Sequence, residues 1–361
     1  MPTVKSMSLT RRRFLAGTTA ALCAPLARGI HAEDSAAGPA FFFVSDTHYL
    51  ASAEKPADMD ASSAEVCARL VDVLNRLPGA SLPAEIGGGT VRAVQGVIHG
   101  GDLIDSGDKN GAKAEAMMRT EIAAYEKDYG LNGTDGKLKY PVFEVHGNHD
   151  SPRSSGHAIE RLKERNRARK GLTGISDNAL HVSWNWGPLH FINVGITVGP
   201  GDGVNKRRRY NPSSSFEFLQ ADLKRNASDG NRPVVITHHV DSLRYLKKTG
   251  EVKGVEWDPE DVKQFGALLA PYNIAMVFYG HTHVRNVWKW TVEDAGKSQA
   301  LDVFNADNSS HFQSNTQAFL YSELTANTLT IRECITRDRW ENISWTPQVW
   351  RKELTHAAAA K

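Results

Sequence analysis

Cysteine is scarce in this chain, with three residues among 361, and one of them, Cys23, lies in the first 32 residues. The other two, Cys67 and Cys334, could pair in an oxidising compartment. Cys67, however, lies beside Val66 and Leu70 at helical spacing, and a buried free cysteine packs as a small hydrophobic side chain. We therefore expect both thiols of the remaining chain to be unpaired.

Long apolar runs are also lacking. The stretch from Ala16 to Leu26 spans roughly a dozen small and apolar residues, short of the ~20 that a transmembrane helix needs, so we expect no stable membrane anchor. It follows Thr10-Arg11-Arg12-Arg13-Phe14-Leu15 and precedes Ile30-His31-Ala32. This order resembles a twin-arginine export signal over residues 1–32, cleaved after Ala32. The resemblance implies a bacterial periplasmic or secreted protein; the alternative is a disordered basic tail.

An excess of either charge is absent once these residues are set aside. The formal net charge is +2, but the first 32 residues hold five basic side chains and no acidic one. The rest of the chain carries 38 basic against 41 acidic residues, about −3. Such a balance gives no basic field for nucleic acid or for an anionic membrane, so neither is an expected partner.

The composition of 40% hydrophobic and 23% charged residues is ordinary for a soluble globular protein. No internal repeat is visible. We expect a single domain over residues 33–355 and a frayed tail over 356–361, which includes the alanine run from Ala357 to Ala360.

The first half of this domain alternates expected strands with expected helices. Apolar runs predict strands at 40–45, 94–99 and 141–146, and amphipathic spacing predicts helices at 63–77 and 111–129. This rhythm is typical of a mainly parallel sheet.

In the second half, residues 180–186 and 189–195 flank Gly187-Pro188 and predict an antiparallel hairpin. Helices are expected at 214–225 and 259–270, before strands at 233–237 and 274–279. The rest, with strands at 286–292, 299–304, 318–323 and 328–333, is expected to form a second sheet packed on the first. We predict an α/β fold, a four-layer α/β/β/α sandwich of two mixed sheets flanked by helices.

Five short blocks of acidic, amide and imidazole side chains follow the expected buried strands. They are Asp46-Thr47-His48, Gly101-Asp102, Gly147-Asn148-His149-Asp150, Thr237-His238-His239 and Gly280-His281-Thr282-His283. Because each block closes a strand, its side chains should gather at the carboxyl ends of neighbouring strands. The glycines before the ligands fit sharp strand exits, where a positive φ or a close backbone approach excludes a side chain.

The chemistry of these side chains predicts a site for two metal ions. Asp46 and His48, one residue apart at a strand end, can both turn onto one ion. The diverging oxygens of Asp102 can bridge two ions at the ~3.5 to 4 Å separation of two-metal hydrolysis. Asn148 offers a neutral oxygen, and imidazoles complete a set that suits iron, manganese or zinc rather than calcium.

In this order, the blocks resemble the motifs of the calcineurin-like metallophosphoesterases: Asp-x-His, Gly-Asp-x-x-Asp, Gly-Asn-His-Asp, a lone His and Gly-His-x-His. The resemblance spans Asp46 to His283, most of the domain. It implies the following ligands: Asp46, His48 and His283 for the first metal, Asn148, His238 and His281 for the second, and Asp102 as the bridge between them.

The resemblance also implies a mechanism, in which a hydroxide between the metals attacks phosphorus in line. His149 would face the substrate and protonate the leaving oxygen, and Asp105 would hold the other ring nitrogen of this histidine. For Asp150, a direct role and the fixing of its loop by backbone hydrogen bonds remain equally open.

Several side chains near the blocks allow two interpretations. Neighbouring residues of a strand face opposite ways, so either His238 or His239 enters the site; we prefer His238 by family register. His99 and His146 fit satisfied core residues better than a role beside the ligands, and His311 lies on a late loop that could reach the site.

A cationic run and two pairs of tryptophans each allow a structural and a functional interpretation. The run Lys206-Arg207-Arg208-Arg209 is either a solvated loop, which we favour, or a clamp for an anionic substrate. Trp184 with Trp186, and Trp288 with Trp290, each face one side of an expected strand, which favours sheet packing over an aromatic binding wall.

The sequence therefore predicts an exported metal-dependent phosphoric ester hydrolase for phosphomonoesters or phosphodiesters. Export favours small phosphorylated substrates: a nucleotide, a glycerophosphodiester, an inositol phosphate or a phospholipid head group. The alternatives are a noncatalytic metal-binding module on the same scaffold and hydrolysis of a bond other than phosphorus–oxygen. The first is disfavoured because every expected ligand is present together with His149 and Asp105.

Overall fold

A computed structural model describes residues 38–205, 207–245 and 256–354 of the chain. The predicted signal at 1–32 and the predicted tail at 356–361 lie outside the described residues. Within the described ranges, every helix is either too short or too polar to cross a membrane.

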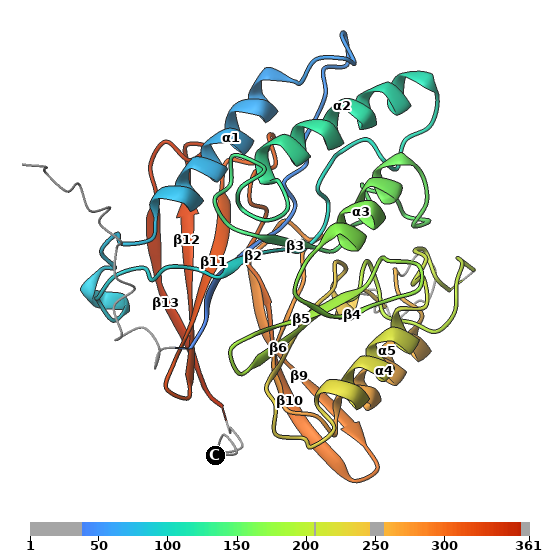
Figure 1. The fold of residues 1–361 in the computed structure, drawn as a ribbon, viewed down its shortest axis with the longest axis vertical. Helices are drawn as coiled ribbons and strands as arrows, with labels where there is room; N and C mark the ends of the chain where they lie inside the picture. Colours follow the sequence, from blue (N-terminus) through green and yellow to red (C-terminus); the bar gives the residue numbers. More distant parts are fainter. Residues whose placement is uncertain (1–37, 206, 246–255, 355–361) are drawn as a thin grey trace, which may run out of the picture. The chain divides into compact units, whose positions relative to one another are not determined.

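Two mixed β-sheets form the centre of the fold (Figure 1). The first has the order β13 (Ser344–Glu353), β12 (Thr328–Thr336), β11 (Gln317–Thr325), β1 (Ala40–Val44), β2 (Gly96–His99) and β3 (Val142–Glu144). The second has the order β4 (Leu172–Ile175), β5 (Val182–Trp186), β6 (Leu189–Asn193), β7 (Val234–Thr237), β8 (Ile274–Phe278), β10 (Lys297–Asn305) and β9 (Asn286–Asp294). Strands β1 to β3 run parallel to one another, as do β6, β7, β8 and β10.

Helices cover the outer faces of both sheets, so the predicted four-layer sandwich is confirmed. Helices α1 (Ala61–Arg76) and α2 (Ala112–Tyr129) share an apolar core with the first sheet. Helices α4 (Ser215–Asn226) and α5 (Pro259–Leu269) share another with the second sheet. A third core lies between the sheets. Helix α3 (His157–Ala168) packs against α2. Two short 3-10 helices, at Ala84–Ile86 and Ser242–Tyr245, complete the elements.

Strand β1 joins two of these cores. Phe41 and Phe43 point between the sheets, where Phe43 stacks on Phe278 of β8 with ring centroids 4.5 Å apart. Phe42 points the other way, toward Phe319 and helix α1. A strand that is buried on both faces is apolar throughout instead of alternating, which is why its sequence, Ala-Phe-Phe-Phe-Val, contains no polar residue.

The predicted helices are confirmed to within about two residues. Capping residues and helix-breaking residues in the sequence mark where they begin and end. Helix α1 begins where the Asp60 carboxylate accepts a hydrogen bond from the Ser63 backbone N–H at 2.9 Å, and it ends before Pro78-Gly79. The sequence reading missed α3, β4 and β13.

The late strands correct one prediction. We expected the four late strands to form the second sheet, but only β9 and β10 do so, whereas β11 and β12, together with the unpredicted β13, extend the first sheet through antiparallel pairing of β11 with β1. Both cysteines are free and buried, as expected, in α1 and β12. Trp184 is a packing residue, stacked on Phe143 at a centroid distance of 3.9 Å.

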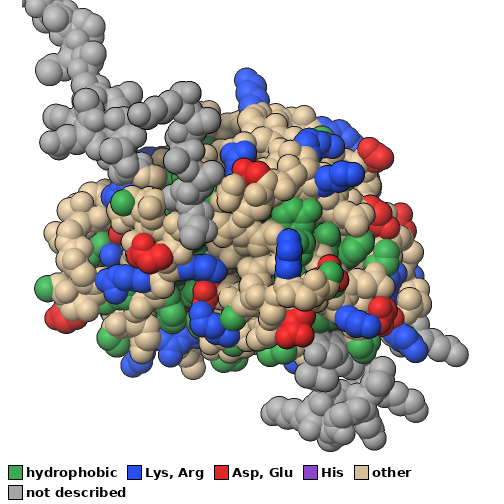
Figure 2. Space-filling view, turned by 90° about the horizontal axis from the view of Figure 1, so that it is seen from below, with side chains coloured by type: hydrophobic (Ala, Val, Ile, Leu, Met, Phe, Trp, Pro, Cys, Tyr) green, Lys and Arg blue, Asp and Glu red, His purple; other side chains and the backbone are tan. Residues whose placement is uncertain are grey.

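The face in Figure 2 carries charges of both signs. Lys and Arg side chains lie interspersed with Asp and Glu, and apolar side chains lie between them.

A buried ion-pair cluster fixes helix α3 to strand β3. Glu144 of β3 is inaccessible to solvent and pairs with Arg165, whose Nε lies 2.6 Å from Oε1, and with Arg169. Burial raises the pKa of the Glu144 carboxyl, but the two guanidinium groups outweigh this effect and lower it. The cluster thereby holds the strand from which Asn148 and His149 emerge.

We expect Glu144→Gln to lower the free energy of unfolding by about 3 kcal/mol, because it leaves two buried guanidinium groups without a counter-charge. Urea unfolding followed by circular dichroism measures the loss. The control is Glu160→Gln, which removes an exposed partner of Lys163 on the same helix and should cost less than about 0.5 kcal/mol. Equal losses in the two variants would contradict the assigned role of the cluster.

Candidate metal centre

The polar blocks meet at the carboxyl ends of five parallel strands, β1, β2 and β3 of the first sheet and β7 and β8 of the second. At these exits the backbone turns sharply. The following residues have left-handed φ values although none is glycine: Asp46 (55°), His48 (46°), Asp102 (52°), His281 (72°) and His283 (48°). Such conformations are uncommon for residues with a Cβ and cluster at functional sites.

Glycines make room for these turns. A Cβ on Gly147 would lie 2.2 Å from Oδ1 of Asp102, and one on Gly280 would lie 2.5 Å from Oδ2 of Asp46. The expectation of close backbone approach is confirmed at both positions, because a side chain would occupy the space of a ligand.

The first group that could hold a metal ion comprises Asp46, His48, Asp102 and His283. Nε2 of His48 lies 3.0 Å from Nε2 of His283 and 3.7 Å from Oδ2 of Asp102, and Nε2 of His283 lies 3.3 Å from Oδ1 of Asp46. Burial raises the pKa of the Asp46 carboxyl, but His283 and His239 outweigh it and hold that pKa well below its usual range.

The second group comprises Asp102, His239 and His281. Nε2 of His239 lies 3.1 Å from Oδ2 of Asp102 and 3.2 Å from Oδ1 of Asn148, so the amide oxygen of Asn148 faces this group as well. Asp102 is therefore common to both groups. The structure brings together Asp46, His48, Asp102, Asn148, His281 and His283 of the predicted ligand set.

His238, the other predicted ligand, does not join them. It packs on the opposite side of β7 against Trp257 and Phe265, with ring centroids 5.4 and 5.6 Å away. His239 takes its place: its Nδ1–H donates to the Gly100 carbonyl at 2.8 Å, which turns Nε2 toward Asp102. The preference for His238 is thus corrected to His239.

The reason lies in the alternation of β7. Val234 and Ile236 face the core under α4 and α5, as does Val240, whereas Val235 faces the core between the sheets. Odd-numbered positions therefore point toward the site and even-numbered positions toward the helices. Both faces of this strand are apolar, so its sequence carries no signal for the choice.

Asp105 also differs from its predicted role. Its Oδ1 accepts a hydrogen bond from Nδ1–H of His48 at 3.2 Å, so this carboxylate orients the imidazole of a candidate ligand; Nδ1–H of His149 donates instead to the backbone carbonyl of Asp105 at 3.3 Å. The carboxylate beside His149 is Asp108, whose Oδ1 lies 3.6 Å from Nδ1 of that ring. Gly107 permits this arrangement, because a Cβ there would lie 2.1 Å from the Asp150 carbonyl.

His149 stands at the edge of the groups. Its backbone N–H donates to Oδ1 of Asp102 at 2.7 Å, while its side chain is 32% exposed. Burial lowers the pKa of the ring, but Asp108, Asp102 and Asp105 outweigh it and raise the pKa to about 10. These carboxylates therefore favour the protonated form of the ring, which is partly open to solvent.

Four further residues near the site fix a loop, approach the candidate ligands or pack in the core. Asp150 accepts backbone hydrogen bonds from Ile104 at 3.0 Å and Gly147 at 2.7 Å, which supports the loop-fixing interpretation. His311 does reach the site, because its ring lies 4.7 Å from that of His48 and 4.8 Å from that of His283. His99 and His146 are buried and hydrogen-bonded to Thr47 and Ser154, in line with core roles.

Glu256 is a site residue that the sequence reading missed. Its Oε2 accepts a hydrogen bond from Nε2–H of His281 at 3.0 Å, and its carboxylate also pairs with Arg209 at 3.2 Å and Arg244 at 3.0 Å. Burial raises the pKa of the Glu256 carboxyl, but His281 and the two arginines outweigh it and lower that pKa. No motif of the sequence marks this glutamate.

Three imidazoles thus share one arrangement. His48, His239 and His281 each use one ring nitrogen to donate to a carboxylate or carbonyl, of Asp105, Gly100 and Glu256 respectively. The other nitrogen of a neutral ring then carries a lone pair, as in metal-binding histidines held by an outer hydrogen bond. With Asp46, Asp102, Asn148 and His283, these residues fit two metal ions in a mixed oxygen and nitrogen environment.

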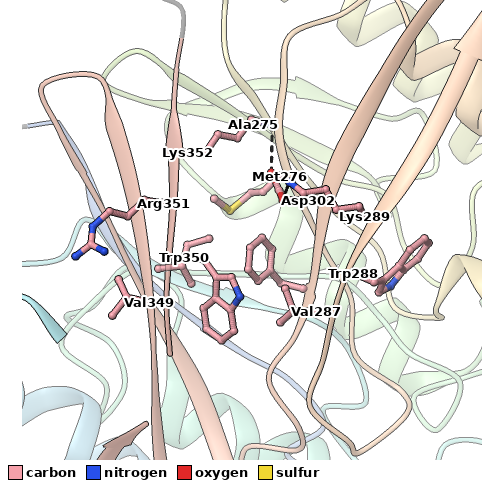
Figure 3. A pocket seen from close by; sticks show the side chains of 12 residues that line it. Ala275, Met276, Val287, Trp288, Lys289, Asp302, Val349, Trp350, Arg351 and Lys352 are labelled. Carbon is pink, nitrogen blue, oxygen red and sulfur yellow. Dashed lines mark hydrogen bonds and ion pairs between the residues drawn. The ribbon is translucent and has the colours of Figure 1, made fainter. Parts of the chain in front are cut away.

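A separate cavity of about 380 Å³ lies between the two sheets (Figure 3). Trp288, Trp350 and Lys352 line it near Ala275, at the amino end of β8, whereas His281 follows the carboxyl end of the same strand. Asp302 pairs with Lys289 at 2.5 Å and with Lys352 at 3.6 Å, so the lysines there are neutralised.

The exchange of His238 for His239 can be tested by metal content. We expect His239→Ala, after reconstitution with Mn²⁺, to bind about one ion less per chain than the unaltered protein, since one group loses an imidazole. His238→Ala should keep the full metal content and lose only stability from its cavity. Inductively coupled plasma mass spectrometry of folded protein measures both. The reverse pattern would restore His238 as the ligand.

The roles of Asp105 and Asp108 can also be distinguished by the metal affinity of their variants. Asp105→Asn should weaken metal binding by about 10- to 100-fold, because His48 loses its orienting acceptor. Asp108→Asn should leave metal affinity within about twofold of the unaltered protein, since Asp108 contacts His149 alone among the site histidines. Competition with a fluorescent chelator gives both affinities; similar losses in the two variants would refute the division of roles.

Comparison with known proteins agrees with this geometry. The family model described as calcineurin-like phosphoesterase matches residues 40–285, which include every block of the site. A search of curated proteins found no match.

Solved structures give distant similarities. A purple acid phosphatase from yellow lupin (Lupinus luteus) seeds has 13% identity and a TM-score of 0.47, over 86% of this chain and 52% of that one. This chain thus spans about half the length of the lupin protein. A putative 5'-nucleotidase from Staphylococcus aureus has 15% identity and a TM-score of 0.36, over 90% of this chain and 56% of that one. A Vps29 variant from Entamoeba histolytica has 13% identity and a TM-score of 0.33, over 87% and 99%.

The family model covers well over half of the chain, from the strand before Asp46 to just beyond His283. This chain therefore belongs to the calcineurin-like phosphoesterase family, whose members are mostly metal-dependent hydrolases.

Proposed function

We propose that this protein is a dinuclear metal-dependent hydrolase of phosphomonoesters or phosphodiesters. The observation that carries the proposal is the position of Asp102: among the described residues four groups of side chains could hold a metal ion, and its carboxylate joins the two groups that contain an aspartate after β1 or a histidine after β7. Two cations bound there would supply Lewis-acid charge to the phosphoryl oxygens and lower the pKa of a coordinated water. We propose that the cations are iron, manganese or zinc, the metals that suit these donors.

The residues around the groups divide the remaining tasks. Asp105, Gly100 and Glu256 orient the imidazoles of His48, His239 and His281, which keeps the donors in place before any substrate arrives. His149 is proposed as the general acid: its exposed, protonated ring can give a proton to the leaving oxygen. Asp108 would keep that ring charged.

Export is the second part of the proposal and rests on the resemblance of residues 1–32 to a twin-arginine signal. An exported enzyme of this kind would act on a small phosphorylated molecule in the periplasm or outside the cell. Nucleotides, glycerophosphodiesters, inositol phosphates and phospholipid head groups all carry the required ester. The alternative, a noncatalytic metal-binding module, is disfavoured because side chains that could serve as ligands, as the acid and as the partner of the acid lie together in the site.

We expect p-nitrophenyl phosphate or bis-p-nitrophenyl phosphate to be hydrolysed once Mn²⁺, Fe²⁺ or Zn²⁺ is added. The ratio of the two rates separates monoesterase from diesterase. On an alkyl phosphate, whose leaving alkoxide needs a proton, His149→Ala should lower kcat by about 10²- to 10⁴-fold while metal content is kept, as expected for a general acid. Asp102→Ala should remove both metal and activity.

No turnover of either ester with any of these metals would refute the proposal and favour the noncatalytic module. If His149→Ala instead removed metal, the ring would be a ligand and its assignment as an acid would fall. The pH profile adds a check on Asp108. Because His149 must be protonated to act, activity should decline as the pH rises through its pKa, and Asp108→Asn should move that decline to lower pH.

A further inference from the structure

A cavity of about 290 Å³ opens beside the candidate metal centre. It is lined by Asn148, which faces the second group of ligands, and by Asp108, the partner of His149. Its remaining lining residues are Pro152, Arg153, Val204, Arg209 and Tyr210. A molecule bound at the metal centre would therefore extend into this cavity past the amide of Asn148.

Arg209 is held in the cavity from two sides. Its Nη1 lies 3.2 Å from Oε1 of Glu256, and its guanidinium carbon lies 5.3 Å from the centroid of the Tyr210 ring. The side chain is nevertheless 62% exposed, so donors of the guanidinium remain open to a ligand. Its position is thus fixed by the same glutamate that orients His281.

Arg153 adds a second cation. Its side chain is exposed, and within residues 38–205, 207–245 and 256–354 no carboxylate forms an ion pair with it. Against the two arginines the cavity lining holds one carboxylate, that of Asp108, which already faces His149. Because Glu256 pairs with Arg209 from outside the lining, Arg153 is the cation of the cavity that has no carboxylate partner among the described residues.

The neighbouring arginines of the cationic run, Arg207 and Arg208, do not line the cavity. Arg208 makes a bidentate pair with Asp261, at 2.6 and 2.7 Å, and serves the structure. Arg207 is exposed and does not line the cavity. The interpretation of the run as a solvated loop therefore fits Arg207 but not Arg208, and Arg209 borders the cavity; Lys206 lies outside the described residues.

We propose that this cavity is a subsite for a second phosphoryl group, adjoining the one that reacts, so that the preferred substrate carries two neighbouring phosphates as a nucleoside diphosphate does. Arginine suits this task because its planar donors bind phosphate oxygens in pairs. The proposal rests on the proposed function, since the reacting phosphoryl group must occupy the metal centre.

The test compares kcat/KM for AMP and ADP in the metal-loaded protein. We expect ADP to be preferred, and Arg209→Ala and Arg153→Ala each to reduce the ADP-to-AMP ratio by about tenfold, mainly through KM. Arg207→Ala is the matched control, because it removes the same charge from the same surface outside the cavity. It should leave the ratio within about twofold.

Metal content and melting temperature are measured for each variant, because Arg209 also contacts Glu256. Arg153→Ala does not touch that glutamate, so it tests the subsite even if Arg209→Ala disturbs the metal centre. An ADP-to-AMP ratio that is unchanged in Arg153→Ala, or reduced equally in Arg207→Ala, overturns the subsite while the hydrolysis of p-nitrophenyl esters stands. If the unaltered protein hydrolyses none of these compounds, the proposed function falls, and the subsite with it.

Discussion

The buried carboxylate of Asp102 is the contact on which the rest of the site depends. It is 1% exposed, and His239 and His48 approach it from two different sheets. Burial alone would raise its pKa, yet the surrounding imidazoles outweigh burial and hold the pKa of Asp102 well below its usual range. Its left-handed φ of 52° costs on the order of 1 kcal/mol, which the two packed sheets must supply.

Packed strands precede the turns that carry the candidate metal ligands, and their packing compensates for the strained backbone. Phe43 and Phe278 stack between the sheets just before the turns that carry Asp46 and His281, so the two sheets cannot shift independently. The Glu144 cluster does the same for the turn that carries Asn148. Outer hydrogen bonds then fix the orientation of each ring, and this combination of rigid strand and oriented side chain is what prepares a site for two cations.

Most of this arrangement is predictable from the sequence, because strand ends and ligand blocks coincide along the chain. The choice between His238 and His239 cannot be predicted in this way. Both faces of β7 are apolar, and which of its alternating side chains face the site depends on how the two sheets pack together. That the carboxylate of Asp108 and not that of Asp105 lies beside His149 depends on how a loop folds over this histidine, and Glu256 comes from a distant segment without a motif. Such contacts arise from tertiary packing, which spacing along the chain does not encode.

Crystals of the protein grown with Mn²⁺, with anomalous scattering recorded at the manganese edge, test the central claim most directly. The account predicts two peaks, one on each side of the Asp102 carboxylate, the first among Asp46, His48 and His283 and the second among Asn148, His239 and His281. A single peak, or two peaks that do not share Asp102, would contradict it.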